Sequence, residues 1–283
     1  MSTTTIEGQA RHARPGSLPP GLKVSQWGII RSEWVKFWSL RSSWYSLAIT
    51  VVGIIGLDCL FAYGAVTAVQ RAESLHRALP SDFNAVDLAM RGYLLAQLVV
   101  GVLGVLVVSG EYGTGMIRSS LAAAPKRLPV LIGKAVVFAV ITFVLTTVTT
   151  FLAYFPVQPI LHSAGLGYSL SDPGVIRAIF GIGGYLTAIG LIGMGLAWIL
   201  RHTAAAVAAL LGLILVIPPL TGLLPSDWQP HITPYLPSEA GTQLAMAHPD
   251  PGGLAGGTAL VTVVVWIAVA IVGGAILLKR RDA

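Results

Sequence analysis

The sequence predicts an all-α polytopic membrane protein with six transmembrane helices and an N-terminal interfacial amphipathic helix. Of its 283 residues, 54% are hydrophobic and only 11% are charged, and the mean hydropathy is +0.76. Soluble domains carry about a quarter charged residues, so this composition indicates a membrane protein. The second observation is a series of six apolar runs, each near the length of about 20 residues that a membrane-spanning helix needs.

The net charge of +6 is compatible with a nucleic acid or a membrane partner. The Lys and Arg residues lie beside apolar runs and form no basic patch interleaved with aromatic residues, so they indicate membrane orientation and no nucleic-acid partner. The one cysteine, Cys59, lies inside an apolar run and cannot form an intramolecular disulfide. The first apolar run begins only near Trp44, so we expect a retained span and no cleavable signal.

Residues 1–23 lack hydrophobic periodicity and are expected to form a disordered cytoplasmic tail. Residues 24–43 are expected to form an interfacial helix. On a helical wheel the apolar side holds Trp27, Ile30, Trp34, Phe37 and Trp38, and the polar side holds Ser32, Glu33, Lys36 and Ser39. Arg31 and Arg41 lie near the apolar flank, where their long stems reach lipid phosphates. The three tryptophans favour the membrane interface over the alternative, a soluble amphipathic helix that packs on a partner.

Residues 44–283 then form the six-span domain. We expect the spans at 45–66, 93–110, 128–155, 175–200, 203–224 and 254–278. Only Arg201 and His202 separate the fourth span from the fifth, which predicts a tight hairpin.

The distribution of Lys and Arg places both termini in the cytoplasm. With the N-terminus inside, thirteen of the 18 basic residues fall on the cytoplasmic side, and Arg71, Arg77, Arg91 and Arg177 fall outside. The remaining one, Lys134, lies within the third span near its inner end, where we expect its ammonium to extend to the inner membrane face.

A polar segment, residues 111–127, follows the second span on the cytoplasmic side. Gly113 and Gly115 flank Thr114, a candidate N-cap for a short helix that Pro125 ends. We interpret this stretch as a cytoplasmic coupling segment that touches another protein; the alternative is an ordinary basic loop. The candidate contact residues are Glu111, Gly113, Thr114, Gly115, Arg118 and Ser119.

The external loop at residues 225–253 is long and rich in proline. Its short apolar piece, Thr242 to Ala247, has two interpretations. One is a re-entrant helix that dips into the outer leaflet, and the other is a surface turn.

Polar residues inside spans are candidates for a transport pathway. Asp58 and Gln97 are the two we select. For Asp58 a structural role is an equal alternative. A third-span cluster of threonines is expected to hydrogen-bond to the preceding helical turn instead. It consists of Thr142, Thr146, Thr147, Thr149 and Thr150.

Signatures of catalysis and cofactor binding are missing from the sequence. The chain has no GxxxxGK[ST] phosphate-binding loop, no metal-ligand spacing of His or Cys, and no nucleophile elbow. We therefore expect no cofactor, no metal and no enzyme activity of the chain by itself. Glycines such as Gly181, Gly183 and Gly184, and the small residues Ala205, Ala208, Ala209 and Gly212, are expected to allow close helix packing.

Three features together resemble the membrane subunit of a type-2 ABC exporter. They are the stretch Arg31–Ser42, the segment Glu111–Arg127, and six spans with the patch Tyr235–Gly241 before the last. The resemblance implies a dimerising six-helix permease with a connecting helix at Trp27–Ser42 and a coupling helix at Glu111–Leu121. Tyr112 and Met116 are variable positions of that pattern. The chain has no fused ATPase domain, so the resemblance implies separate cytosolic ABC ATPase subunits as partners, with a second permease copy and membrane lipids.

The expected function is ATP-driven export of a small amphipathic molecule, peptide or lipid-like substrate across a bacterial plasma membrane. Two alternatives remain. An ATP-independent carrier or channel would use intramembrane charges, of which Asp58 is the candidate. An intramembrane lipid-modifying enzyme would need clustered His, Asp or Glu at one membrane face, and the sequence shows no such cluster.

Overall fold

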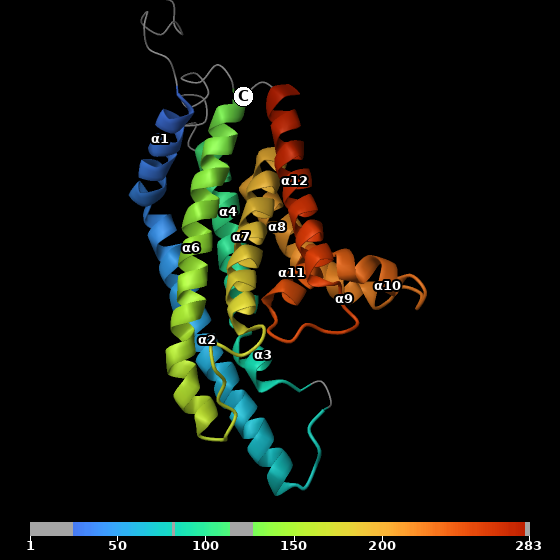
Figure 1. Ribbon diagram of the computed structural model, residues 1–283. Helices are drawn as coiled ribbons and strands as arrows, with labels where there is room; N and C mark the ends of the chain where they lie inside the picture. The colour runs from blue at the N-terminus through green and yellow to red at the C-terminus, as the bar shows by residue number, and fades with distance from the viewer. Residues whose placement is uncertain (1–24, 81–82, 114–126, 281–283) are drawn as a thin grey trace, which may run out of the picture.

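The computed structural model describes residues 25–80, 83–113 and 127–280, and all regular structure in these ranges is helical (Figure 1). The predicted tail at 1–23 lies outside the described residues, as do Thr114, Gly115, Arg118 and Ser119 of the predicted coupling segment.

Six helical segments in the described ranges are long and apolar enough to cross a membrane, as predicted. They are α2 (Arg41–Ser74), α3 with α4 (Ala85–Ala89, Tyr93–Gly113), α6 (Arg127–His162), α7 (Val175–Leu200), α8 to α9 (Thr203–Leu211, Ile217–Thr221) and α12 (Gly256–Arg280). Both α1 (Gln26–Ser39) and the last turn of α12 lie at one end of the bundle, which we call the terminal side (Figure 1). The opposite end, where α2 joins α3 and α6 joins α7, is the loop side.

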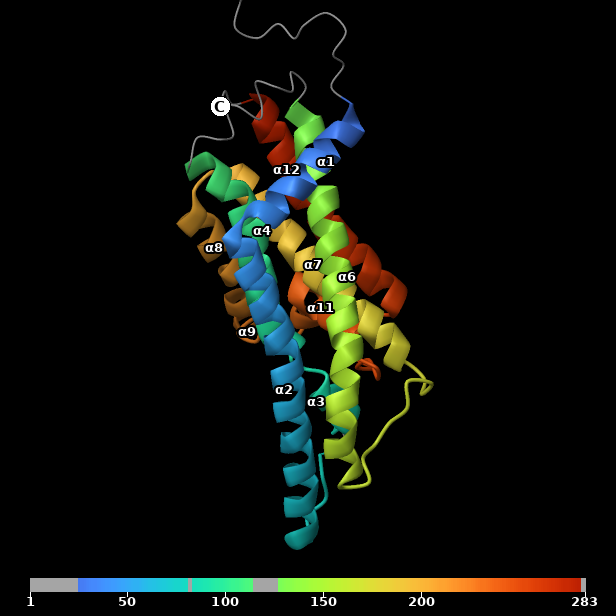
Figure 2. The same ribbon diagram turned by 90° about the vertical axis from the view of Figure 1, so that its left-hand side faces the viewer.

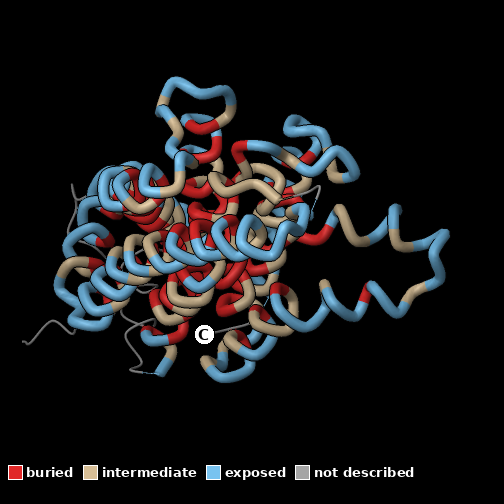
Figure 3. Tube along the Cα trace, turned by 90° about the horizontal axis from the view of Figure 1, so that it is seen from below, coloured by how far each residue is buried: buried red, intermediate tan, exposed pale blue. Residues whose placement is uncertain are grey.

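Helix α7 is the centre of the bundle. It packs against α4, α6, α8, α11 and α12, and most of its own residues are buried. Figure 3 shows the buried residues in the middle of the molecule and the exposed ones around them. Glycines allow this packing: a Cβ at Gly104 of α4 would overlap the backbone of Gly190 in α7, and a Cβ at Gly190 would overlap the ring of Phe138. Gly181 and Gly183 also lie in close contacts, with Leu244 and Thr147. The predicted packing role is therefore confirmed for these two glycines, whereas Ala205, Ala208 and Ala209 are exposed on the single chain.

Two spans exceed the predicted lengths. Helix α2 continues to Ser74 through Gln70, Arg71 and Glu73, because polar residues in water continue a helix as well as apolar ones do. Helix α6 runs past Phe155 and includes Pro156 and Pro159. A proline removes only one backbone hydrogen bond, and membrane helices tolerate this loss. With α3, the far ends of α2 and α6 enclose a small separate apolar cluster of Ala62, Val66, Val157 and Leu161.

The fifth span is irregular. Its middle is a π-helix, η1 (Gly212–Val216), followed directly by Pro218 and Pro219 in α9. These prolines cannot donate to the carbonyls four residues earlier, so the chain widens locally. The predicted hairpin before this span is confirmed, since α7 ends at Leu200 and α8 begins at Thr203.

The loop at 225–253 folds into α10 (Gln229–Ile232), η2 (Thr233–Tyr235) and α11 (Pro237–Ala245). Helix α11 starts five residues before the predicted apolar piece and runs antiparallel along α7. Ala247 lies against Gly174, and Gly241 lies against Tyr185. Ala240 joins a cluster with Ala188, which is 13 residues into α7, or about 20 Å from its start. The segment therefore packs inside the bundle and is not a surface turn; entry into the outer leaflet stays a prediction.

Helix α1 forms where an interfacial helix is predicted, with Ser25 as its N-cap. The residues on its buried and exposed sides differ from the predicted apolar and polar sides. Its buried residues are Ile29, Glu33 and Phe37, and Trp27 and Trp34 are exposed. Leu40 is extended and separates α1 from α2, so the helix ends earlier than the predicted boundary at residue 43. Figure 2 shows α1 running obliquely to α2 at the terminal side.

Candidate functional site

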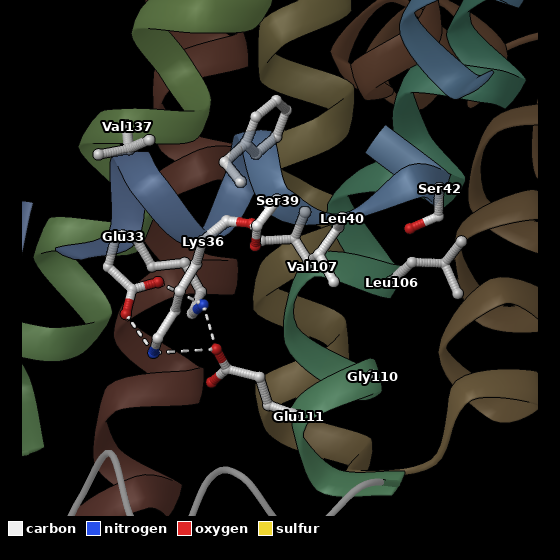
Figure 4. Close-up of a pocket in the computed structure, with 12 residues that line it drawn as sticks. Glu33, Lys36, Ser39, Leu40, Ser42, Leu106, Val107, Gly110, Glu111 and Val137 are labelled. Carbon is white, nitrogen blue, oxygen red and sulfur yellow. Dashed lines mark hydrogen bonds and ion pairs between the residues drawn. The ribbon is translucent and has the colours of Figure 1, made fainter. Parts of the chain in front are cut away.

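Four charged side chains from three helices meet at the terminal side of the bundle. Lys134 Nζ lies 2.6 Å from Glu33 Oε2 and 2.9 Å from Glu111 Oε1. Lys36 Nζ lies 2.8 Å from Glu33 Oε1 and 3.4 Å from Glu111 Oε1. Acids and ammonium groups thus alternate around a closed ring with no net formal charge, which we call the charge cluster. Figure 4 shows Glu33 and Lys36 of α1 converging with Glu111 of α4.

Local sequence explains how these residues meet. Glu33 and Lys36 are three residues apart on α1 and therefore share one face. That face continues with Ile29 and Phe37 and packs on α6. Gly133 of α6 lies under Ile29, where a Cβ would be 2.9 Å from Ile29 Cγ2, so a small residue lets α1 approach. Lys134 follows directly and points at Glu33.

Two predictions about these residues are wrong. Lys134 does not extend to the membrane face: it is 4% exposed and is paired with two carboxylates inside the bundle. Glu33 does not lie on a solvated side of α1, because it is also 4% exposed and faces α6. The pairing offsets the cost of burying both charges, which an isolated ammonium or carboxylate would pay in full.

Electrostatics favours the charged forms of both α1 residues. Burial alone would raise the pKa of Glu33, but its ion pairs and hydrogen bonds with Lys134 and Lys36 outweigh burial and leave that pKa below the ordinary value. Burial would lower the pKa of Lys36, but the contacts with Glu33 and Glu111 outweigh it and leave that pKa raised. The contacts within the ring therefore favour the ionised forms of Glu33 and Lys36.

The cluster borders a cavity of about 280 Å³ between α1, the start of α2, α4 and α6. Its walls are mainly apolar, and its polar groups are the charge cluster and the hydroxyls of Ser39 and Ser42 (Figure 4). The second carboxylate oxygen of Glu111, Oε2, is buried and has no hydrogen-bond partner among the described residues. An orphaned buried acceptor of this kind is costly and marks the cluster as incompletely satisfied.

The other predicted contact residues occupy different surroundings. Glu111 is not in a loop: α4 extends through it to Gly113, and Glu111 is 7% exposed and points into the bundle. Gly113 is exposed at the end of α4. Trp38 packs at 4.9 Å on Trp44, whose indole donates to the Trp38 carbonyl, and Arg41 is exposed at the first position of α2.

The two pathway candidates lie elsewhere and make structural contacts. Asp58 is buried in α2 and accepts a 2.7 Å hydrogen bond from the Gly92 backbone just before α4 begins. Gln97 is buried in α4 and accepts from the Tyr185 hydroxyl of α7. These contacts join spans to one another, which favours the structural alternative for Asp58 without testing a pathway role. Three of the threonines in the third span, Thr142, Thr146 and Thr150, donate hydrogen bonds to the carbonyl four residues earlier, as expected.

Sequence reasoning missed a second polar junction, at the loop side. Asp87 accepts hydrogen bonds from the Ala247 and His248 backbones, and His248 Nδ1 lies 3.2 Å from Asp87 Oδ2. Asn84 Nδ2 is 3.0 Å from the same ring nitrogen. Together they fasten the chain after α11 to the short helix α3. No local sequence motif predicts this contact, because the two partners are about 160 residues apart in the chain.

The sequence does contain a feature that predicts the contact between Glu111 and Lys134 in the charge cluster. Glu111 ends the second span and Lys134 lies in the first two turns of the third, so both occupy the same end of consecutive helices. A charged residue inside a membrane is expected to pair with a residue of opposite charge. The positions of Glu111 and Lys134 therefore predict that these two residues pair.

No known protein family and no curated protein matches the chain. In the part of the chain that the structure describes, no group of three or more His, Cys, Asp and Glu side chains is arranged to hold a metal ion.

Proposed function

We propose that the chain is the membrane-spanning permease subunit of a type-2 ABC exporter in a bacterial plasma membrane. It would couple ATP hydrolysis by two separate cytosolic ATPase subunits to export of a small amphipathic molecule, peptide or lipid-like substrate. The chain would work with a second permease copy, identical or related, and would have both termini in the cytoplasm.

The observation that carries the proposal is the charge cluster. It ties α1 to α4 and α6 at the point where α4 ends and residues 114–126 follow. Buried ion pairs resist separation because each group left alone in the bundle would be strongly destabilised. A push on the segment after Gly113 would therefore reach α1, α4 and α6 as one unit, which is what a mechanical coupling device requires.

The test is co-purification with an ATPase encoded beside this chain. A cysteine at Ser119, in a Cys59→Ala background, is offered to a bifunctional cross-linker with and without ATP. We expect a cross-link whose yield depends on nucleotide. Failure to associate with any ATPase would contradict the proposal and favour the ATP-independent carrier.

Glu111 supplies a functional test of the same proposal. Glu111→Ala removes the carboxylate that joins α4 to both lysines, and we expect ATP hydrolysis to continue while export falls at least tenfold. The matched control is Glu73→Ala, an exposed acid at the end of α2, with no expected change. Unchanged export by Glu111→Ala, with normal membrane insertion, would remove Glu111 from the coupling path.

A further inference from the structure

The cavity beside the charge cluster is amphipathic. One part of its wall is apolar, formed by Phe37, Leu40, Leu106, Val107 and Val137. The other part carries Ser39, Ser42, the backbone at Gly110 and the four charged residues. At about 280 Å³ it has room for a small polar head and several methylene groups, and it lies just below the roughly 300–1,000 Å³ of typical ligand sites.

The charged side chain of this cavity that is most open to a ligand is a cation, Lys36. The Glu33 and Glu111 side chains are 4% and 9% exposed and are turned to the lysines, whereas the Lys36 side chain is 31% exposed. Contacts with the two acids keep the pKa of Lys36 above its ordinary value despite burial, so its ammonium stays charged. Arg41 is exposed and lies in the chain between Leu40 and Ser42, two residues that line the cavity.

The start of α2 favours an anion at the same place. Its N-cap, Leu40, supplies no side-chain hydrogen bond, and no acidic residue lies in the first turn. The first backbone N–H groups of a helix attract negative charge, and an acid or a bound anion normally satisfies them. Here the first turn carries Arg41 and Ser42, a composition that suits a phosphate.

The aromatic pair of Trp38 and exposed Trp44 lies where α1 ends and the spanning helix α2 begins. Tryptophans are enriched at the boundary between lipid and water, so the cavity lies at head-group depth. We propose that this cavity binds one phospholipid, its phosphate beside Lys36, Ser42 and the start of α2 and its acyl chain along Leu106 and Val107. This lipid is a resident ligand of the permease domain and not its cargo.

Native mass spectrometry of the chain purified in detergent tests the proposal without any ATPase, so its outcome is independent of the proposed function. The probe is palmitoyl-oleoyl phosphatidylglycerol. The comparison ligand is the diacylglycerol with the same chains, which lacks the phosphate. Inorganic phosphate at millimolar concentration serves as a competitor that lacks the chains. We expect one retained phosphatidylglycerol, about tenfold weaker retention of diacylglycerol, and no displacement by phosphate.

Two variants locate the site. Lys36→Gln removes the exposed charge, and Arg31→Gln, on exposed α1 surface outside the cavity lining, is its control. Gly110→Leu adds a side chain at a residue that lines the cavity and changes none of the four charged residues; a Cβ at Gly110 meets no atom within 4 Å. Gly56→Leu in α2, equally open, is its control. We expect about tenfold weaker retention for Lys36→Gln and for Gly110→Leu, and wild-type retention for both controls.

Equal retention of diacylglycerol would overturn the phosphate assignment, and displacement by inorganic phosphate would overturn the acyl-chain assignment. Wild-type retention by Gly110→Leu would overturn the site itself. Because Gly110→Leu leaves all four charges in place, it tests the site even if Lys36→Gln fails to fold.

Discussion

At the scale of single residues, Lys134 determines whether the charge cluster is stable. Its ammonium contacts both buried carboxylates, and without it Glu33 and Glu111 would repel each other in a medium of low dielectric constant. Lys36 contacts the same two carboxylates, but its single positive charge cannot neutralise both acids. Loss of Lys134 is therefore expected to weaken the contacts that hold α1, α4 and α6 together.

We predict that Lys134→Met, which keeps most of the side-chain volume, lowers the free energy of unfolding by about 3–5 kcal/mol. The measurement is unfolding by SDS in mixed micelles, followed by tryptophan fluorescence. The control is Lys279→Met at the exposed end of α12, which should change stability little. Adding Glu33→Gln to Lys134→Met restores neutrality, so the double variant should be more stable than the single one; a simple sum of two losses would contradict this account.

The cluster also sets a pH dependence. The folded pKa of Glu33 lies below its ordinary value of 4.5, so its stabilisation is present above pH 4.5 and is lost as pH falls through the folded pKa. The folded pKa of Lys36 lies above its ordinary value of 10.5, so its stabilisation is present below that pH and is lost as pH rises through the folded pKa. The contribution of Glu33 and Lys36 should be constant from roughly pH 5 to 10.

Comparing wild type with Glu33→Gln in the same SDS titration isolates this effect. The stability difference between the two proteins should be constant at neutral pH and should shrink as the medium becomes more acidic than pH 4.5. A difference that grows on acidification would show that Glu33 is protonated, and not ionised, in the folded protein.

At the scale of helices, hydropathy predicted the number of spans and most of their cores. Hydropathy did not predict where the helices end: α2 continues through Arg71 and Glu73, and α6 continues through two prolines. The reason is that helix continuation depends on backbone hydrogen bonds and not on hydropathy. For the site, the sequence analysis selected Glu33, Lys36 and Glu111 as candidate functional residues. It wrongly placed Glu33 on the solvated side of α1 and the Lys134 ammonium at the inner membrane face. Periodicity shows which residues share a helix face, but which neighbouring helix covers that face depends on tertiary packing.

Helix α11 yields a prediction at this scale. A side chain at Gly241 would overlap the ring of Tyr185, so Gly241→Val should displace α11 from α7. A cysteine at buried Ser238, in a Cys59→Ala background, reports the displacement through its rate of reaction with a maleimide. We expect the rate to rise about tenfold, the equivalent of about 1.4 kcal/mol of lost docking.

The control for that measurement is Gly257→Val at the start of α12, where a Cβ meets no atom within 4 Å. It should leave the labelling of Ser238→Cys unchanged. Equal labelling in the Gly241 variant and the control would mean that α11 does not depend on close contact with Tyr185.

At the scale of the whole molecule, the lengths of the spans are unequal. The 34 residues of α2 and the 36 of α6 correspond to about 51 and 54 Å, well beyond the bilayer core of about 30 Å. Helix α12, with 25 residues, corresponds to about 38 Å. Because α1 and the charged end of α12 define the terminal side, the surplus of α2 and α6 projects at the loop side (Figure 1). The apolar cluster between α2, α3 and α6 keeps this projection folded.

This geometry leads to a prediction about orientation. The terminal side carries Lys36, Arg41, Lys279 and Arg280, and basic residues are retained in the cytoplasm, so the projection of α2 and α6 should face the outside. Single cysteines at Glu73 and at Arg280, each in a Cys59→Ala background, test it in intact cells with a membrane-impermeant maleimide. We expect the cysteine at position 73 to react in intact cells and the one at position 280 only after lysis. The reverse labelling would show that the topology is inverted and that residues 114–126 lie outside the cell. A cytosolic ATPase could then not contact this segment, which would contradict the proposed coupling.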